Sequence, residues 1–161
     1  MIKLIRNCLG NKKILYNHEG EAIRWSYVEQ LVALQEDEGL YAATKIRRRH
    51  LQWQKEKMKV KLATQTFSKS VADALSFCRE DLQLPEFAGS CAISRFCIEM
   101  NNMFDLLNSR NLICKSKSKK CIFIENVEKM KTKVQSYYVF LQNIQDEKGF
   151  FNPEQKQNFS V

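Results

Sequence analysis

The chain has 161 residues, of which 44% are hydrophobic and 11% aromatic, so it can bury one core and its length fits a single domain. Five glycines and two prolines are few for a turn-rich β protein, and no apolar stretch approaches the roughly 18 residues that cross a bilayer. Six scattered cysteines without a CxxC pair favour reduced thiols over a disulfide framework. The composition therefore predicts an intracellular, all-α, compact multi-helix bundle with a formal net charge of +8.

The first two predicted helices lie in the N-terminal third. Asn17 to Gly20 has the chemistry of a turn, and apolar residues then recur at helical spacing from Trp25 until the helix ends near Gly39. A second helix is predicted around a buried stripe, with cations projecting from its other faces. The stripe consists of Ala43, Ile46, His50 and Trp53.

Two further helices are predicted in the middle of the chain. Apolar residues repeat at intervals of three and four from Phe67 to Cys78, and the pattern stops before Pro85, whose ring disfavours helical geometry at the preceding residue. The most regular helix follows Ser90, a suitable N-cap, and continues to Leu107. We expect one whole side of this helix to be buried.

The C-terminal part begins with a polar and basic segment, residues 108–120, which predicts an exposed, flexible loop. Apolar residues from Val127 to Ile144 define a last long helix, with Gly149 as its natural stop. The residues after Pro153 are polar and are expected to form a loose tail.

Residues 42–61 carry most of the positive charge. They hold eight Lys or Arg against one acid, Glu56, and so account for +7 of the formal +8. Clustered cations repel one another unless an anion compensates them, so a basic surface that meets phosphate is one interpretation, and a solvated basic face is the other. The candidate nucleic-acid-binding residues are Arg47, Arg48, Arg49, Lys55, Lys57 and Lys61.

The common signatures of catalysis and nucleotide binding are missing from the sequence. It contains neither a GxxxxGK[ST] phosphate-binding loop nor a GxGxxG fingerprint. His18 and His50 have no evident Ser or Cys partner, and the acids form no pattern for two-metal chemistry. We therefore predict no catalytic residues and no protein metal ligands in this chain.

Several separate phrases resemble one family, and they occur in the order that the family has. They are KLIRN (Lys3 to Asn7), RHL (Arg49 to Leu51), MKVKLATQT (Met58 to Thr66), SVADAL (Ser70 to Leu75) and FDLLNSRN (Phe104 to Asn111). Together they cover about residues 3–111. The chain resembles the P element transposase family, including its THAP-type relatives, in the helical region called the GTP-binding insertion domain.

In that family, an N-terminal zinc-dependent DNA-binding domain precedes an RNase H-like catalytic domain, which the helical insertion interrupts. The insertion binds GTP with magnesium and helps to organise protein and transposon DNA. The resemblance thus implies a nuclear protein whose partners are GTP and DNA. No membrane partner is expected, and self-association stays open. Residues 1–150 would form the insertion-like domain and residues 151–161 a tail.

The resemblance also implies that this chain is not itself an enzyme. KLIRN resembles the stretch just after a catalytic aspartate, an acid that would lie before Met1, and we find no equivalent of the later catalytic glutamate or of the zinc-binding set. Cleavage and strand transfer are therefore expected to be missing from this chain.

The family's nucleotide contacts map onto two groups of residues. Lysines would offset phosphate charge, Phe104 would face the base, and Asp105 or Asn108 would recognise its polar edge. The full set is Lys45, Lys59, Val60, Ser68, Phe104, Asp105 and Asn108.

Two alternatives from other classes stay open. One is a fragment that binds nucleic acid without sequence preference through the basic segment, Arg47 to Lys61. The other is a helical protein-interaction module that uses exposed aromatic residues such as Trp53 or Tyr138.

Overall fold

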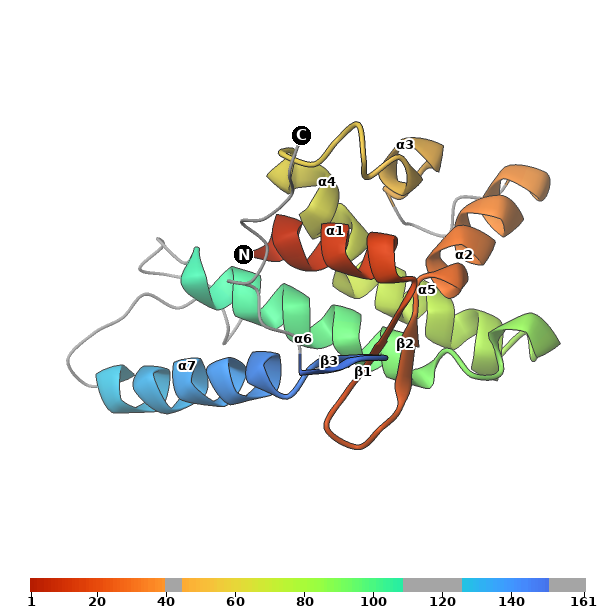
Figure 1. Ribbon diagram of the computed structural model, residues 1–161. Coiled ribbons are helices and arrows are strands. Elements are labelled where there is room, and N and C mark those ends of the chain that lie inside the picture. Colours follow the sequence, from red (N-terminus) through yellow and green to blue (C-terminus); the bar gives the residue numbers. More distant parts are fainter. Residues whose placement is uncertain (40–44, 109–125, 151–161) are drawn as a thin grey trace.

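The computed structural model describes residues 1–39, 45–108 and 126–150 of the chain (Figure 1). These residues are mostly helical, as the composition predicts. The helices are α1 (Ile2–Lys12), α2 (Ser26–Asp37), α3 (Arg48–Leu51), α4 (Val60–Thr66), α5 (Lys69–Glu80), α6 (Cys91–Leu107) and α7 (Val127–Gln142), with a 3-10 turn, η1 (Pro85–Phe87), between α5 and α6. Most of the loop predicted over residues 108–120 lies outside the described residues, and so does the whole predicted tail, residues 151–161.

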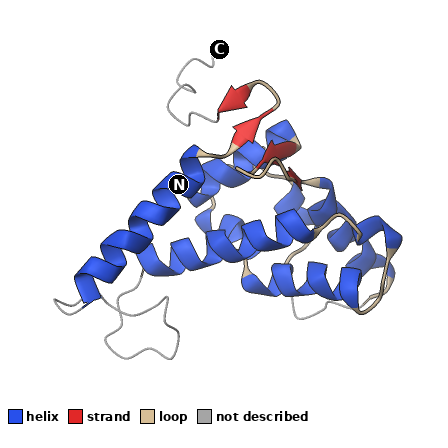
Figure 2. Ribbon diagram, turned by 90° about the horizontal axis from the view of Figure 1, so that it is seen from below, coloured by secondary structure: helices blue, strands red, loops and turns tan. Residues whose placement is uncertain are grey.

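The all-α prediction is wrong in one respect, because the fold contains a small antiparallel sheet. Its strands are β1 (Ile14–Tyr16), β2 (Ala22–Arg24), β3 (Gln145–Asp146) and β4 (Gly149–Phe150), in the order β2-β1-β3-β4. Figure 2 shows the strands gathered at one edge of the helical body. Strands of two or three residues are too short to display the alternation that identifies a strand in sequence.

The sheet joins the two ends of the described chain. The pairing of Tyr16 with Gln145 links the N-terminal hairpin to the C-terminal one. The predicted turn at Asn17 is confirmed, since its carboxamide oxygen accepts the backbone N–H groups of Glu19 at 3.0 Å and Glu21 at 2.8 Å. Gly149 does not end a helix as predicted; it lies in β4, after α7 has ended at Gln142.

The first helix, α1, is not predicted by the sequence pattern. The usual burial of apolar residues and exposure of charged ones is partly reversed in this helix, because Arg6 is fully buried whereas Leu4 is 54% exposed. An apolar stripe is the main sequence signal of a helix, and these two residues interrupt it.

The single helix predicted over residues 43–53 is wrong, since α3 has only four residues and is followed by turns over residues 53–58. The predicted stripe is nevertheless buried at Ile46, His50 and Trp53, while Ala43 lies outside the described residues. The expectation of an exposed Trp53 is therefore also wrong. Burial of these residues does not require a helix, because Trp53 packs against Gly10 of α1 from a turn.

The predictions for the middle of the chain are largely confirmed. Helix α5 begins after Ser68, whose hydroxyl accepts the backbone N–H of Val71 at 3.4 Å, and it ends before Pro85. Helix α6 buries the expected stripe from Ile93 to Met100, but near its end Phe104 is only half-buried and Leu107 is 55% exposed. Between the two helices, Ser94 donates a hydrogen bond to the backbone oxygen of Ala72 at 2.9 Å.

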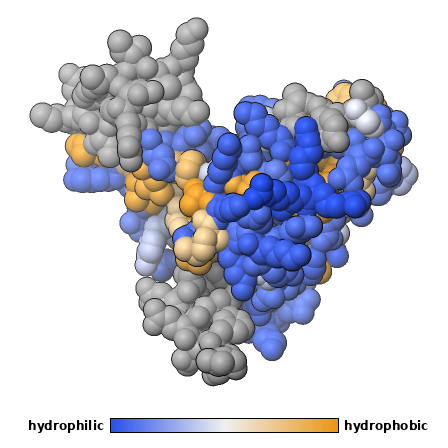
Figure 3. Space-filling view, turned by 90° about the horizontal axis from the view of Figure 1, so that it is seen from above, coloured by the Kyte–Doolittle hydropathy of each residue, from blue (hydrophilic) through white to orange (hydrophobic). Residues whose placement is uncertain are grey.

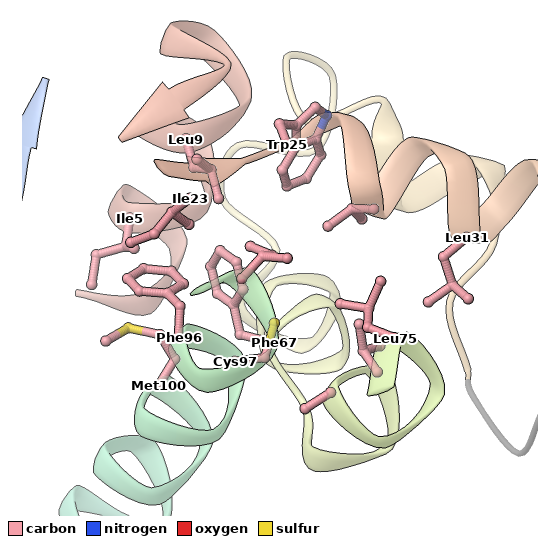
Figure 4. Close-up of a cluster of buried hydrophobic side chains, with 14 of the residues drawn as sticks. Ile5, Leu9, Ile23, Trp25, Leu31, Phe67, Leu75, Phe96, Cys97 and Met100 are labelled. Atoms are coloured by element: carbon pink, nitrogen blue, oxygen red, sulfur yellow. The ribbon is translucent and has the colours of Figure 1, made fainter. Parts of the chain in front are cut away.

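The core forms where α1, β2, α4, α5 and α6 meet (Figure 4). The rings of Phe67 and Phe96 contact edge to face, with centroids 5.4 Å apart. Cys97 lies beside them, and its burial raises the pKa of the thiol to about 12, which makes it inert at neutral pH.

Helix α7 lies alongside α6 (Figures 1 and 2) and is less buried than its apolar pattern predicts. Met130 is buried, but Val134 and Tyr138 are 44% and 56% exposed. The prediction of an exposed Tyr138 is thus confirmed.

Candidate nucleotide and phosphate-binding surface

The basic loop, residues 52–59, is held by α1. The buried guanidinium of Arg6 donates from Nη2 to the backbone oxygen of Glu56 at 2.6 Å and to Oδ1 of Asn7 at 2.8 Å. Asn7 in turn donates from Nδ2 to the backbone oxygen of Lys57 at 3.3 Å. We call these contacts the Arg6–Asn7 clamp. They hold the backbone of the loop in place although its side chains are mostly charged.

The clamp connects two of the family phrases, KLIRN and MKVKLATQT, which are far apart in sequence. Lys3 adds a contact from its Nζ to the sulfur of Met58 at 3.7 Å. Burial lowers the pKa of the Arg6 guanidinium, and the charge of Glu56 opposes this shift. The sequence resemblance includes Arg6 and Asn7, but no local pattern identifies their partners.

Glu56 is the acid at the centre of the loop. Its side chain is only 12% exposed, and its two carboxylate oxygens pair with Nε of Arg49 at 2.7 Å and Nζ of Lys59 at 3.0 Å. These hydrogen bonds lower the pKa of Glu56, so it is ionised at neutral pH. One partly buried carboxylate therefore orients two of the predicted contact residues.

The six candidate nucleic-acid-binding cations differ in their partners. Arg48 pairs with Glu36 at 3.0 Å and Arg49 with Glu56, while Arg47 donates from Nη1 to the backbone oxygen of Ile46 at 2.7 Å. In contrast, three lysines are exposed and pair with no acid among residues 1–39, 45–108 and 126–150. They are Lys55, Lys57 and Lys61.

The surface around this loop is mostly hydrophilic. Figure 3, seen from the side of α3 and α4, shows hydrophilic residues across this face with a smaller apolar area among them. The exposed apolar side chains near the loop include Met58 at 73% and Val60 at 41%. The surface thus combines unpaired cations with a few apolar contacts.

The predicted phosphate-side residues lie at the ends of short elements. Lys45 is exposed and precedes α3, Lys59 is the N-cap of α4, and Val60 is the first residue of that helix. Ser68 is the N-cap of α5, and its hydroxyl is already used there as an acceptor. Lys59 is the last residue of the clamped loop and Val60 follows it, so the backbone position of both depends on the loop.

The predicted base-side residues share the last turn of α6. Phe104 is half-buried and packs against the core, and its backbone oxygen accepts Nδ2 of Asn108 at 2.8 Å. Asp105 accepts Nδ2 of Asn101 at 3.2 Å. The side-chain hydrogen bonds described for Lys59, Ser68 and Asn108 all go to neighbours in sequence, so these bonds do not join the two groups.

The chemistry of this set suits a purine nucleotide. The lysines supply positive charge for phosphates, Phe104 supplies a ring, and Asp105 and Asn108 supply a carboxylate and a carboxamide for a polar base edge. Among the described residues, no group of three or more His, Cys, Asp or Glu side chains could hold a metal ion. Magnesium in nucleotide sites is bound largely through phosphate oxygens and water, so it does not require a cluster of protein carboxylates.

Comparison with known protein families matches residues 1–121 to the TNP-like, GTP-binding insertion domain. The chain therefore belongs to this family. It is 37% identical over 111 residues to the human (Homo sapiens) protein DNA transposase THAP9, a match that covers 69% of this chain but 12% of the relative. No solved structure matches the chain.

The match confirms the resemblance that the sequence phrases indicate. It also shows that the chain spans only a small part of its transposase relative. No helix in the described part of the chain has both the length and the apolar character needed to cross a bilayer.

Proposed function

We propose that this chain is a transposase-derived insertion module that binds GTP with magnesium and organises protein and DNA without cleaving DNA. Its site of action would be the nucleus. Membership of the family supports the nucleotide as ligand, and the relative's printed name supports a connection to DNA transposition. The catalytic acids of a transposase would be supplied outside this module.

The observation that carries the proposal is the Arg6–Asn7 clamp. It holds the loop backbone at Glu56 and Lys57 against α1, two residues before Lys59. The backbone that carries the Lys59 cation is therefore positioned before a phosphate binds. Preorganised cations bind phosphate better than mobile ones, because less conformational freedom is lost on binding. The clamp also explains why the KLIRN phrase accompanies the lysine-rich phrase in one functional unit.

Guanine selectivity is assigned to the last turn of α6. The carboxylate of Asp105 can accept hydrogen bonds from the N1–H and the 2-amino group of guanine, whereas adenine presents an acceptor at N1. A site that depends on such hydrogen bonds rejects a base that cannot make them.

The test is thermal unfolding with magnesium and either GTP or ATP. A ligand present at 100 times its Kd stabilises the folded state by about 2.7 kcal/mol, which corresponds to roughly 5–10 °C for a chain of this size. We expect GTP to raise the melting temperature more than ATP does, and Asp105→Ala to remove this difference. Asp73→Ala, at an exposed aspartate on α5, is the matched control and should keep the guanine preference.

Equal stabilisation by the two nucleotides in the unchanged protein would reject guanine-specific binding. No stabilisation by either would reject nucleotide binding as a whole.

Non-specific nucleic-acid binding is the second candidate, and one observation favours it. Lys55, Lys57 and Lys61 are exposed and have no acidic partner among the described residues, although they lie on or beside a clamped loop. Binding of arbitrary duplex through these residues would release counterions and weaken steeply with salt. Affinity that does not change with salt concentration would exclude this function.

A further inference from the structure

A hollow of about 330 Å³ lies where the β1–β2 turn meets α6 and α7, away from the basic loop. We call it the hairpin hollow. Its inner surface is apolar and is formed by Ile23, Ala92, Phe96, Ile98 and Phe140. The rings of Phe96 and Phe140 are 6.1 Å apart between centroids and tilted by 34°, and Figure 4 shows Phe96 beside Ile23 at the core end of this region.

One side of the rim is an ordered network of charges on the hairpin. Asn17 donates from Nδ2 to a carboxylate oxygen of Glu21 at 2.7 Å, and Arg95 of α6 pairs with the same carboxylate. Arg95 also approaches Glu19, with Nη1 3.6 Å from Oε2, and Nε2 of His18 lies 4.0 Å from the other oxygen of Glu19. Arg95 is therefore already neutralised by the hairpin.

The other side of the rim carries a carboxylate without a counter-ion. Glu99, one turn beyond Arg95 on α6, is half-buried, and no cation pairs with it among the residues that the structure describes. The charge of Glu99 also acts on Tyr137 of α7. Burial raises the pKa of this phenol, and the negative charge of Glu99 raises it further. Of the residues that line the hollow, Glu19 and Glu99 carry negative charge and Arg95 carries positive charge, which leaves a formal −1. Arg95 is also paired with Glu21, which lies beside the hollow.

We infer that the hairpin hollow binds a lysine or arginine side chain of a partner polypeptide, with the ammonium or guanidinium paired to Glu99 and the apolar stem against Phe96 and Phe140. Long basic side chains bury their methylene stems along apolar surface while the charged head meets polar groups. Cations are also attracted to the faces of aromatic rings. The volume is large enough to admit one long side chain.

The charge of the rim distinguishes this occupant from others. Phosphate groups, and thus nucleic acid, are repelled by the acidic rim, so this surface is complementary to a different partner from that of the basic loop. The inference does not rest on nucleotide binding, because no residue of the proposed GTP site lines the hairpin hollow.

The experiment uses the whole chain labelled with ¹⁵N and three blocked amino acids as probes. N-acetyl-lysine methylamide and N-acetyl-arginine methylamide carry the charge, whereas N-acetyl-norleucine methylamide has a similar stem without it. We expect the two cationic probes to cause saturable changes in amide chemical shift around residues 17–23, 95–99 and 137–140. The norleucine probe should bind at least tenfold more weakly.

Glu99→Gln should weaken the cationic probes about tenfold, and raised salt should weaken them in the unchanged protein. Glu128→Gln, at an exposed glutamate of α7, is the control and should bind as the unchanged protein does. The proposal is overturned if norleucine binds as well as lysine, if Glu99→Gln binds lysine normally, or if no probe gives saturable shifts. The dispersion of the amide spectrum shows whether each variant is folded.

Discussion

The indole ring of Trp53 lies directly on the backbone of Gly10, so that a Cβ atom added to Gly10 would come within 2.5 Å of Trp53 Cδ1. This contact joins α1 to the basic loop at the opposite end from Lys3 and Met58. With the Arg6–Asn7 clamp between them, it makes α1 the support of the loop.

Gly10→Ala is therefore expected to destabilise the protein, although alanine is the better helix former. The gain in helix propensity is about 1 kcal/mol, whereas overpacking a buried ring costs about 1–3 kcal/mol. Trp53 is 9% exposed and has little room to move. The cost of overpacking should therefore exceed the gain in helix propensity. Urea unfolding measures the difference. Asn11→Ala, at the exposed neighbouring position, should not lower stability, and a more stable Gly10→Ala would show that the indole does not lie there.

Arg6→Met is expected to leave the stability of the fold almost unchanged but to make the basic loop, residues 52–59, less ordered. Methionine keeps much of the buried volume, and replacing a buried cation by an apolar side chain can be close to neutral in stability. The hydrogen bond to the backbone of Glu56 is nevertheless lost. Amide hydrogen exchange should become faster in residues 52–59 while α5 and α6 stay protected. Unchanged exchange in the loop would mean that the clamp does not hold it.

Glu56→Gln is expected to destabilise the protein in a pH-dependent way. The hydrogen bonds from Arg49 and Lys59 hold the pKa of Glu56 below its ordinary value of 4.5. The stabilisation is thus fully present above that ordinary value, and it is lost as the pH falls through the lower pKa of the folded state. Urea unfolding of the two proteins should differ most near neutral pH and converge in acid. Glu128→Gln, at an exposed glutamate of α7, is the control and should have little effect on stability at neutral pH.

If the second candidate function holds, the three unpaired lysines should matter more for nucleic acid than the paired arginines. Replacing Lys55, Lys57 and Lys61 by Gln removes up to three phosphate contacts, so the negative slope of log K against log salt should become shallower, by up to about 2.7. Replacing Arg48 and Arg49 should change the slope less for each cation removed, since both are engaged by acids. Replacing Lys129 and Lys133 of α7 is the control. The same loss per cation removed in all three variants would indicate attraction by net charge without a defined surface.

The predictions from sequence succeeded where burial follows a local period. Helices α5 and α6 were predicted because Phe67, Val71 and Leu75 in one and Ile93, Phe96 and Met100 in the other repeat at helical spacing and are buried. They failed in α1, where Arg6 is buried for its hydrogen bonds across the chain, and around Trp53, which is buried from a turn. The candidate site was reached through the family phrases, and its roles in nucleotide binding stay predictions.

The sequence by itself determined the helical class, the positions of the central helices and the family, because each depends on which residues follow one another. Only the tertiary structure decided that α1 supports the basic loop, that Tyr16 and Gln145 close a small sheet, and that Glu99 meets an aromatic hollow. The physical reason is separation along the chain: the hydrogen bond from Arg6 to Glu56 spans 50 residues. Contacts over such distances leave no local periodicity, and packing alone establishes which residues meet.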